Sequence, residues 1–540
     1  MPRWVKWLLG VVGAFAVVVV IAAAVVPRLV DTPRIQTYIA TSAAQALGRP
    51  VKFTSVTLRV LPLPAVELHG LEVAEDPRFG TAPFLRLDTG RVRLKLLPLL
   101  TGRVELGDIV LKKPVIALIR AADGRLNIST LGVATEPRAP ARPGRPSGGT
   151  AAAGTVAVAR VLVDDGLVTY VARDKGDAAA QYRLSDFDLT LTGGGTQFTF
   201  RGRAKLQPGG VSLTLSDGAI GLSGARPLTE ASLRGKVAID GDDVAPLAAV
   251  AVGPTPAIAG AVTGTLSLGG TVGAPTAAGE VTMAPLAVTQ VQAQCPEPKR
   301  RTLSIPTVKL NAAWQDQRLT GKPLTATLGG TLAAQLTATL DGGVRVELAD
   351  LAIKALPLEK VLVDYMCQGY AITGPLDLTG ALAFEARDVL NTLSGPGQLR
   401  IGSGKVVGSQ ALALIGSVVR VGGAISSILS ADLPASVFDS PLEFESITGT
   451  YTLANGVATT RDLLYTSRAM KVSIAGDYGL ATGRMNLDMV VSHGRGQLQA
   501  KVTGTTVSPS IRVSPSTVLR DVDPQKAEKG LKDLLKRFGR

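Results

Sequence analysis

The sequence has few of the residues that catalyse reactions or bind metals. Its 540 residues include only two histidines, His69 and His493, and two cysteines, Cys295 and Cys367. No Cys-x-x-Cys, His-x-x-His or His-Glu-x-x-His spacing occurs, so the usual zinc sites are not expected. The Gly-x-Ser-x-Gly turn of many serine hydrolases is also missing. The sequence therefore predicts no catalytic residue, no metal and no cofactor, and a protein that is not an enzyme.

Two stretches rich in glycine or aspartate have simpler explanations than ligand binding. The segment "GSGKVVG" (402–408) lacks the first Gly of a phosphate loop, and Val406 stands where Ser or Thr is needed. It is interpreted as a tight turn between strands. The segment "DGDD" (240–243) lacks the spacing of a calcium loop and is also interpreted as a turn.

Charged residues are scarce, at 19%, and their balance is basic, with a formal net charge of +14. A basic chain can bind nucleic acid, but an exported protein meets little of it, so nucleic acid is not an expected partner. Anionic lipid headgroups are a natural counterpart for a basic exported protein. An interpretation of equal weight is that the positive charge keeps the protein soluble.

Only one stretch is apolar for long enough to cross a membrane. Residues 4–26 (WVKWLLGVVGAFAVVVVIAAAVV) carry a single charge, at Lys6. At about 1.5 Å per residue they can span a hydrocarbon core of roughly 30 Å. A cleaved signal peptide is the alternative, but its apolar core is usually about 7–15 residues long. Arg3 and Lys6 favour a cytoplasmic N-terminus. In the oxidising compartment then expected for the rest of the chain, Cys295 and Cys367 could pair, and the sequence leaves this open.

Beyond residue 50, apolar and polar residues alternate with a period of two, which indicates β-strands. In "RVRLKL" (91–96), Val92, Leu94 and Leu96 share one face of a strand, and the charged residues share the other. The 60 glycines and 33 prolines indicate frequent turns between short strands. The alternation recurs at residues 187–191, 211–215, 344–348, 382–384, 485–491 and 498–502.

A sheet with one apolar and one polar face can be accommodated in two ways. Two sheets can pack with their apolar faces together in a closed sandwich, the common arrangement for antiparallel sheets, and the pattern alone favours it. Alternatively, one long sheet can curl, because an open sheet of many strands does not stay flat. Its apolar face then lines a groove.

Changes in composition divide the chain into six parts. Residues rich in Pro, Gly and Ala without periodicity predict a linker. Short amphipathic helices are predicted at residues 32–48, at 409–432 and in the basic C-terminal tail. The predicted parts are a transmembrane anchor (1–30), an N-terminal β region (31–133), the linker (134–155), a β-rich middle region (156–390), a C-terminal β region (391–520) and a basic amphipathic tail (521–540).

Two sets of motifs lie in the N-terminal and C-terminal β regions. The first set is "LGRPVKF" (47–53), "LPLPAVELHGLEVAEDP" (61–77), "LLPLLTGRVELGDIVLKKPVIALIR" (96–120) and "DGRLNISTL" (123–131). The second set includes "LSGPGQLRIGSGKVVG" (393–408) and "VSIAGDYGLATGRMNLDM" (472–489). On these motifs the chain resembles the AsmA family of Gram-negative bacteria, with Ile128 where the family has a tryptophan. The motifs are structural and not catalytic.

The resemblance implies a mainly β fold in which an N-terminal transmembrane helix precedes an elongated, curved antiparallel β-sheet. This sheet would be related to that of TamB-like and bridge-like lipid-transfer proteins, and its hydrophobic groove would shield phospholipid acyl chains. The resemblance thus reverses the preference for a closed sandwich. Candidate groove residues are Val92, Leu94, Leu96, Val104, Leu106, Leu487 and Met489.

The resemblance also implies a location and partners. The protein is expected to cross the inner membrane once, through residues 4–26, with the bulk of the chain in the periplasm and a role in outer-membrane biogenesis. Expected partners are phospholipid acyl chains and an envelope protein at the C-terminal tail. An alternative is a periplasmic scaffold for outer-membrane proteins that acts through a sheet edge. A hydrolase that uses His69 and His493 is the weakest alternative.

Overall fold

The computed structural model of the chain describes residues 37, 40, 41, 43–45, 47–59, 65–94, 106–131, 160–173, 180–194, 196–222, 227–340, 343–408, 410, 443–468, 470–493 and 496–514. The predicted anchor (4–26), Leu96, Val104, the predicted linker (134–155) and the predicted tail (521–540) lie outside the described residues. Within the described residues, no helix is both long and apolar enough to span a bilayer.

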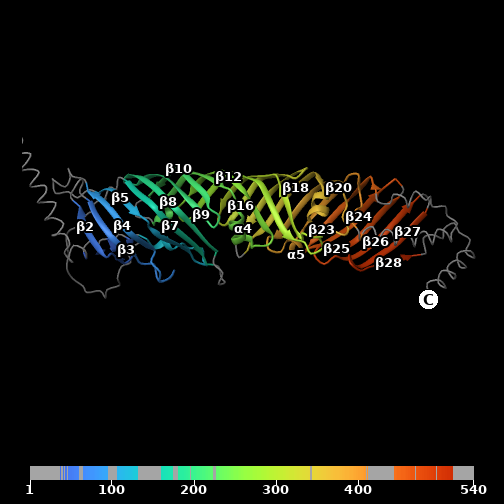
Figure 1. Cartoon of the computed structure of the whole chain (residues 1–540), viewed down its shortest axis with the longest axis horizontal. Helices are drawn as coiled ribbons and strands as arrows, with labels where there is room; N and C mark the ends of the chain where they lie inside the picture. The colour runs from blue at the N-terminus through green and yellow to red at the C-terminus, as the bar shows by residue number, and fades with distance from the viewer. Residues whose placement is uncertain are drawn as a thin grey trace, which may run out of the picture. The chain divides into compact units, whose positions relative to one another are not determined.

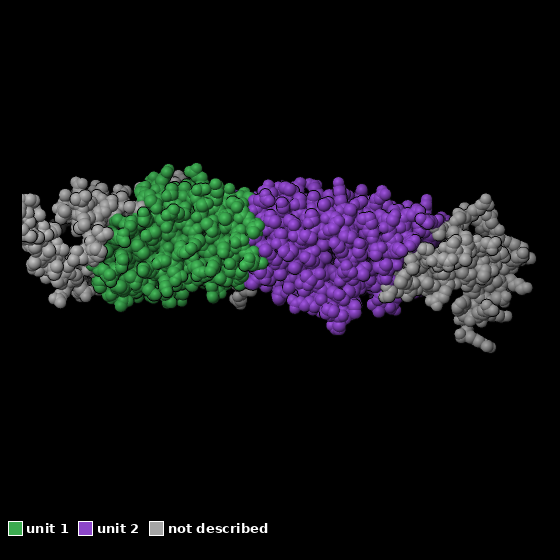
Figure 2. Space-filling model, turned by 45° about the horizontal axis from the view of Figure 1, so that its top comes forward, with its two compact units in different colours: residues 1–242, 263–279 green, residues 243–262, 280–540 purple. Residues whose placement is uncertain are grey.

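The chain forms two compact units, coloured green and purple in Figure 2. Unit 1 comprises residues 1–242 and 263–279, and unit 2 comprises residues 243–262 and 280–540. Each unit is built mainly from long antiparallel ladders of β-strands with few helices. The mainly β, antiparallel fold that the alternation predicts is therefore confirmed. The six sequence-based parts remain a prediction.

In unit 1, successive strands pair with their neighbours in the chain, as Figure 1 shows for β7 to β10. The exceptions are β1, which pairs with β3, and β5 and β6, which both pair with β4 and, in parallel, with β7. Parallel neighbours need a crossover connection, which is why a long connection separates β6 from β7. The strands are β1 (Val51–Lys52), β2 (Ser55–Arg59), β3 (Ala65–Val73), β4 (Leu85–Leu94), β5 (Leu106–Lys112), β6 (Val115–Arg120), β7 (Arg160–Ala172), β8 (Ala180–Gly194), β9 (Gln197–Gln207), β10 (Val211–Gly221) and β11 (Ser232–Gly241).

Two strands, β12 (Ala257–Gly270) and β13 (Pro275–Val291), contribute residues to both units. In unit 2, antiparallel pairing runs from β15 to β20 and on through β23 to β28, the orange and red strands of Figure 1. The strands are β14 (Arg300–Ile305), β15 (Thr307–Gln315), β16 (Arg318–Thr327), β17 (Thr331–Thr339), β18 (Arg345–Pro357), β19 (Pro375–Glu385), β20 (Gly395–Ile401), β21 (Gly404–Lys405), β22 (Glu443–Phe444), β23 (Ser446–Ala454), β24 (Val457–Thr466), β25 (Lys471–Gly479), β26 (Arg484–His493), β27 (Gly496–Thr505) and β28 (Pro509–Ser514).

The helices whose two ends both lie within the described residues are all short. Their bounds are η1 (Asn127–Thr130), η2 (Leu228–Glu230), α4 (Ala245–Val252), η3 (Glu359–Tyr365) and α5 (Val389–Thr392). Helix α4, which follows the predicted turn at 240–243, is apolar on every side and therefore not amphipathic, unlike the helices that the sequence predicts. The amphipathic helix expected at 32–48 agrees with the helical residues described between 37 and 47.

One predicted turn is wrong. Residues 402–408 do not form a tight hairpin, because β20 pairs with β19 and β23 and not with the segment that follows it. Instead, β21 leaves the main sheet and pairs with β22. Val406 forms a single bridge with Ile372. The glycines of this segment therefore lead the chain out of the sheet and do not reverse it.

Several of the described strands contain an extra residue that the alternation pattern does not reveal, β16 and β24 among them. In four other strands the extra residue is an Asp with a positive φ, a conformation that short polar side chains tolerate better than most. In β10, Asp217 lies between Leu215 on one side and Gly218 and Ile220 on the other. The pairing of β10 with β9 and with β11 shifts there by one residue. The four residues are Asp165 (φ 54°), Asp186 (φ 50°), Asp217 (φ 51°) and Asp350 (φ 49°).

These bulges share a sequence pattern of an apolar residue, any residue, Asp, any two residues, and an apolar residue. The extra residue changes the period so that the apolar side chains on both sides of the Asp stay on one face of the sheet. A β-bulge also increases the local twist and bends its strand. The repeated Asp bulges therefore preserve the apolar face while they add twist to the sheet.

Candidate functional site

The pairing registers of unit 1 place six apolar residues in one continuous row. Each residue lies opposite the next across six adjacent strands, from β3 to β9. The row consists of Val66, Val92, Ile109, Val161, Leu191 and Phe200. Because residues on neighbouring strands that face one another share a side of the sheet, these six side chains form one apolar face.

All six residues of this apolar face of unit 1 are partly exposed, and none is buried. The opposite face is charged. Glu67 forms ion pairs with Arg59 at 3.0 Å and with Arg91 at 2.7 Å, and Arg93 forms one with Asp108 at 3.3 Å. In a closed sandwich the facing sheet would bury large aliphatic residues. A partly exposed apolar row of this length is the kind of surface that binds another molecule.

Unit 2 has a similar row. Leu463, Ile474, Met489 and Ala500 lie opposite one another on β24 to β27. Leu487, two residues from Met489 on the same face, lies between Gly476 and Val502. Unlike the row of unit 1, this face includes buried residues, Ala500 and Val502 on β27. Leu487 and Met489 are partly exposed, whereas Asn486 and Asp488 beside them are exposed on the other face. These residues define the apolar face of unit 2.

The structure places the candidate groove residues as follows. Val92 belongs to the apolar face of unit 1. The backbones of Leu94 and Leu106 pair with each other on β4 and β5, and the structure describes only their backbones. Leu487 and Met489 belong to the apolar face of unit 2. Leu96 and Val104 lie outside the described residues.

Part of the apolar face of unit 2 is covered by the chain itself. Leu358, Ile401, Val406 and Phe444 form a buried cluster. Partly buried residues pack around it: Leu362, Tyr370, Ile372, Leu376, Leu399, Ile447 and Tyr465. Leu376, Ile401, Ile447 and Tyr465 are opposite one another on β19, β20, β23 and β24. The sheet therefore supplies one side of this cluster, and the segments 358–372, 406 and 444 supply the other.

The apolar face of unit 2 also carries tyrosines, whose hydroxyl groups are polar. Burial raises the pKa of Tyr451, Tyr465 and Tyr478, because a poorly hydrated site disfavours the charged phenolate. The Tyr465 ring is tilted against Phe444, with ring centres 5.6 Å apart. Neutral hydroxyls on an otherwise apolar surface can donate hydrogen bonds to an uncharged polar group of a bound molecule.

A buried polar network in unit 1 is the feature that reasoning from the sequence missed. Arg49 forms an ion pair of 2.8 Å with Glu75, and both side chains are almost fully buried. Asn127, which is 0% exposed, donates through Nδ2 to Glu75 Oε2 at 2.6 Å and to the Ala117 carbonyl at 2.7 Å. Its Oδ1 accepts the backbone N–H of Ile119 at 3.1 Å.

The three residues of this network come from three of the quoted motifs, "LGRPVKF", "LEVAEDP" and "DGRLN". Arg49 Nη2 also donates to the Asn127 carbonyl and to Thr130 Oγ1, at 2.5 and 2.9 Å. The motifs thus bring together three segments far apart in the chain. Their signal in the sequence is a polar residue within each motif.

The two histidines lie in different units. His69 lies on β3, with its Nε2 3.4 Å from Thr57 Oγ1. His493 ends β26 in the other unit, and its side chain lies outside the description. No group of three or more His, Cys, Asp or Glu side chains suited to a metal occurs among the described residues.

The fold and these surfaces define a class of strand-rich proteins whose antiparallel sheet keeps a partly exposed apolar face opposite a charged one. The model of the AsmA family matches residues 1–256, and this part of the chain belongs to the AsmA family. The match includes the motifs that form the buried network of unit 1. Neither the curated proteins nor the solved structures contain a significant match to the chain.

Proposed function

We propose that the protein binds phospholipid acyl chains along its apolar faces and contributes in this way to lipid transfer and outer-membrane biogenesis. The observation that carries this proposal is the row of partly exposed apolar residues from Val66 to Phe200. Removing one acyl methylene from water contributes about 0.8 kcal/mol, so a row across several strands can offset part of the cost of extracting a lipid. Family membership is consistent with this role.

The proposal includes a location and a mode of action. The protein crosses the inner membrane once through residues 4–26, with its N-terminus in the cytoplasm and its strands in the periplasm. The disulfide between Cys295 and Cys367 supports an oxidising compartment. The chain acts as a passive binder and not as an enzyme, and a relation to TamB-like and bridge-like proteins is part of the same proposal.

Photo-crosslinking in living cells tests the proposal. A photoreactive residue at Val92 or Leu487 should crosslink lipid, identified by mass spectrometry, whereas the same residue at Arg91 or Asp488 should crosslink far less. These pairs are matched, because each control is the next residue on the same strand and faces the other way. Equal lipid crosslinking from both faces would contradict the proposal.

A charge on the apolar face should weaken lipid binding. In Leu487→Glu, a carboxylate would have to lose its water against an acyl chain, so bound lipid should fall about tenfold or more, since about 1.4 kcal/mol corresponds to a factor of ten. Asp488→Ala is the control and should retain its lipid. Quantification of lipid that co-purifies with the full-length protein measures both variants.

The edge strand β28 favours a second candidate, a scaffold for envelope proteins. Among the described residues β28 pairs only with β27, and Val507 beside it is 81% exposed. An unpaired strand edge can add a strand from another protein. Photo-crosslinkers at Ser510 and Arg512 that capture a protein, together with no lipid at Val92 or Leu487, would favour the scaffold.

A further inference from the structure

The segment of residues 358–373, here called the strap, leaves the sheet of unit 2 between β18 and β19. It begins with η3, a π-helix, and then continues through turns to Thr373. The amide of Leu358 donates to the Gly374 carbonyl at 3.1 Å, which brings the two ends of the strap together. A loop closed at its base in this way can move as one piece.

The underside of the strap is apolar and rests on the apolar face of unit 2. Leu358 and Ile401 belong to one buried cluster, and Leu362 and Ile372 pack against it. Ile401 is only 6% exposed under the strap, whereas Leu487 and Met489 on the same unit are partly exposed. The strap therefore occupies the surface that an acyl chain would need at β19 and β20.

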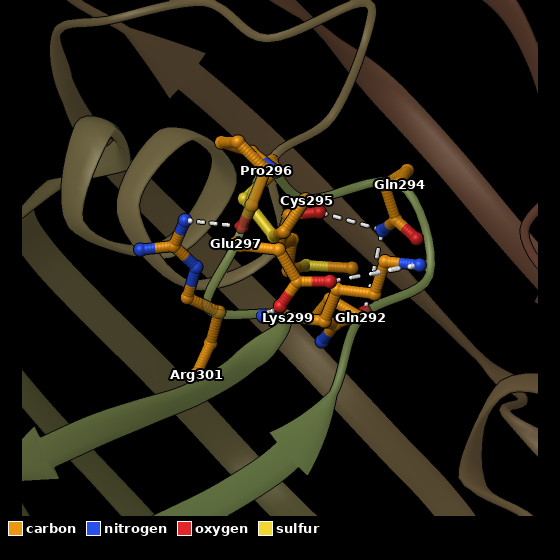
Figure 3. The surroundings of a disulfide bond; sticks show 9 residues. Gln292, Gln294, Cys295, Pro296, Glu297, Lys299 and Arg301 are labelled. Atoms are coloured by element: carbon orange, nitrogen blue, oxygen red, sulfur yellow. Dashed lines mark hydrogen bonds and ion pairs between the residues drawn. A yellow bond between two sulfur atoms is a disulfide. The ribbon is translucent and has the colours of Figure 1, made fainter.

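The strap is fastened to distant strands on both sides of this surface. Cys367 forms a disulfide with Cys295, which lies in the loop between β13 and β14 (Figure 3). Beside the disulfide, Gln294 Nε2 donates to the Met366 carbonyl at 2.6 Å. On the other side, the Tyr370 hydroxyl donates to the Thr506 carbonyl, which follows β27, at 3.2 Å.

A short hydrogen-bonded seam holds the end of the strap. The amide of Thr373 donates to the Lys405 carbonyl at 2.8 Å, and the amide of Val407 donates to the Ala371 carbonyl at 3.0 Å. This seam uses the segment 402–408 that leaves the main sheet. The seam and the tethers are few compared with the ladder of a full strand, so the strap can separate from the sheet without disrupting it.

The closed position leaves two buried polar atoms without a hydrogen-bond partner among the described residues. They are Oε2 of Glu359, at the start of η3, and Nε of Arg301, on β14. Figure 3 shows Arg301 close to the loop that carries Cys295, where its Nη2 donates to the Pro296 carbonyl at 3.2 Å. Water would satisfy both atoms if the strap lifted, so closure costs part of what its apolar contacts contribute.

We propose that the strap is a gate in the acyl-chain path of unit 2, held closed by the Cys295–Cys367 disulfide and by the Tyr370–Thr506 hydrogen bond. This inference rests on the proposed lipid-binding function. When the gate is closed, acyl chains have access to the surface around Leu487 but not to the surface around Ile401, which is buried. When it lifts, the apolar face continues across β20 and β19.

The experiment places a photoreactive residue at Ile401 or at Leu487 in the full-length protein in cells. Each is combined with the unaltered strap, with Cys367→Ser and, separately, with Leu362→Ala, which keeps the disulfide but removes an apolar contact of the strap. Lys360→Ala is the matched control, because Lys360 is an exposed residue of η3. Lipid attached at each position is quantified by mass spectrometry.

With the unaltered strap and in the Lys360→Ala control, Leu487 should crosslink lipid several-fold more than Ile401. In Cys367→Ser and in Leu362→Ala, crosslinking at Ile401 should rise several-fold while crosslinking at Leu487 stays unchanged. Equal crosslinking at both positions with the unaltered strap, or no rise at Ile401 in either variant, overturns the gate.

Absence of lipid at Leu487 in every variant would overturn the proposed function, and a separate measurement then judges the strap. Hydrogen exchange of residues 358–373 should speed up several-fold in Cys367→Ser while β24 to β27 keep their protection. Unchanged exchange in the strap would show that the disulfide does not hold it and would overturn the gate. A general loss of protection would identify a folding defect, and Leu362→Ala then decides by the same exchange measurement.

Discussion

The two units treat the same kind of apolar face in different ways. In unit 1 the row from Val66 to Phe200 is partly exposed along its whole length. In unit 2 the strap, Val406 and Phe444 pack on the row of Leu376, Ile401, Ile447 and Tyr465 and bury Ile401, whereas Leu487 and Met489 are partly exposed. The strands of both units show the same alternation. The difference teaches that the pattern within strands decides which face is apolar, and that the connections between strands decide whether this face is covered.

The units also differ in what fixes their connections. In unit 1 the ion pair between Arg49 and Glu75, completed by Asn127, joins three segments through buried polar contacts. In unit 2 a disulfide joins two segments separated by 72 residues in the chain. A buried polar network depends on every partner being present. A covalent bond does not depend on its neighbours in this way, so it suits a segment that lies against a surface proposed to bind acyl chains.

The largest effect is expected when the buried ion pair of unit 1 loses its carboxylate. In Glu75→Ala, Arg49 keeps its charge in a buried site without a partner, so the free energy of unfolding should fall by about 3–5 kcal/mol. Thermal unfolding followed by circular dichroism measures the loss. Hydrogen exchange should show faster exchange in unit 1, with little change in unit 2.

The control for Glu75→Ala is Glu72→Ala. Glu72 pairs with Arg86 at 3.3 Å, but both side chains are about half exposed. The loss of such a surface pair should cost less than about 1 kcal/mol. Similar losses in the two variants would remove the proposed contrast between a buried network in unit 1 and a covalent tether in unit 2.

An intermediate effect is expected at the Asp bulges, which occur in both units. In Asp217→Val, a β-branched residue must adopt a left-handed conformation, so stability should fall by roughly 1–2 kcal/mol. Asp217→Gly should be nearly neutral, because glycine adopts positive φ without strain. Chemical denaturation measures both.

The same pair of substitutions at Asp350 tests whether unit 2 uses the bulge in the same way. Asp350→Val should lose about as much as Asp217→Val, roughly 1–2 kcal/mol, if the strain of the backbone dominates. An Asp350→Val variant as stable as the unaltered protein would show that the bulge matters in unit 1 only.

The smallest effect concerns a carboxylate that supports one bulge. Asp188 accepts the backbone N–H of Asp165 at 3.0 Å and the Arg203 Nε–H at 2.7 Å. These donors, the Asp165 N–H first, lower the pKa of Asp188 below its ordinary value. A lowered pKa in the folded state means that the carboxylate stabilises the protein at pH values above its unfolded pKa, and that this contribution is lost as the pH falls through the folded pKa.

Asp188→Asn should therefore lower stability at neutral pH by less than about 1 kcal/mol, because the pair is partly exposed. The difference from the unaltered protein should vanish in acid. In unit 2, the Asp462 carboxylate accepts hydrogen bonds from Thr450 and Thr460, and among the described residues no arginine donates to it. Added salt should therefore reduce the effect of Asp188→Asn more than that of Asp462→Asn. Equal salt dependence would contradict this difference.

Much of the fold was predictable because strand periodicity is a local property. The residues at 344–348 and 382–384, identified by alternation alone, pair directly, with Val346 opposite Phe384 and Leu348 opposite Leu382. The Asp bulges were not predicted, because an apolar spacing of three and then two interrupts a search for strict alternation. The signal was nevertheless present as an Asp two residues after an apolar residue.

The candidate surface was predictable in part. Val92, Leu487 and Met489 lie on apolar faces because each alternates with charged or polar neighbours. The strap was not predictable, since its apolar residues match the sheet only when β18, β19 and β20 are already in place. The tight turn expected at 402–408 was wrong for the same reason, because Lys405 and Val407 pair with strap residues far away in the chain.

The sequence by itself determined the strands, their apolar and polar faces and the family, because each depends on residues within a few positions of one another. Only the tertiary structure decided that Cys295 pairs with Cys367, that Arg49, Glu75 and Asn127 meet, and which part of an apolar face the chain covers. The physical reason is that these contacts join segments dozens of residues apart. Their energies depend on burial and alignment, which exist only once the sheet has formed.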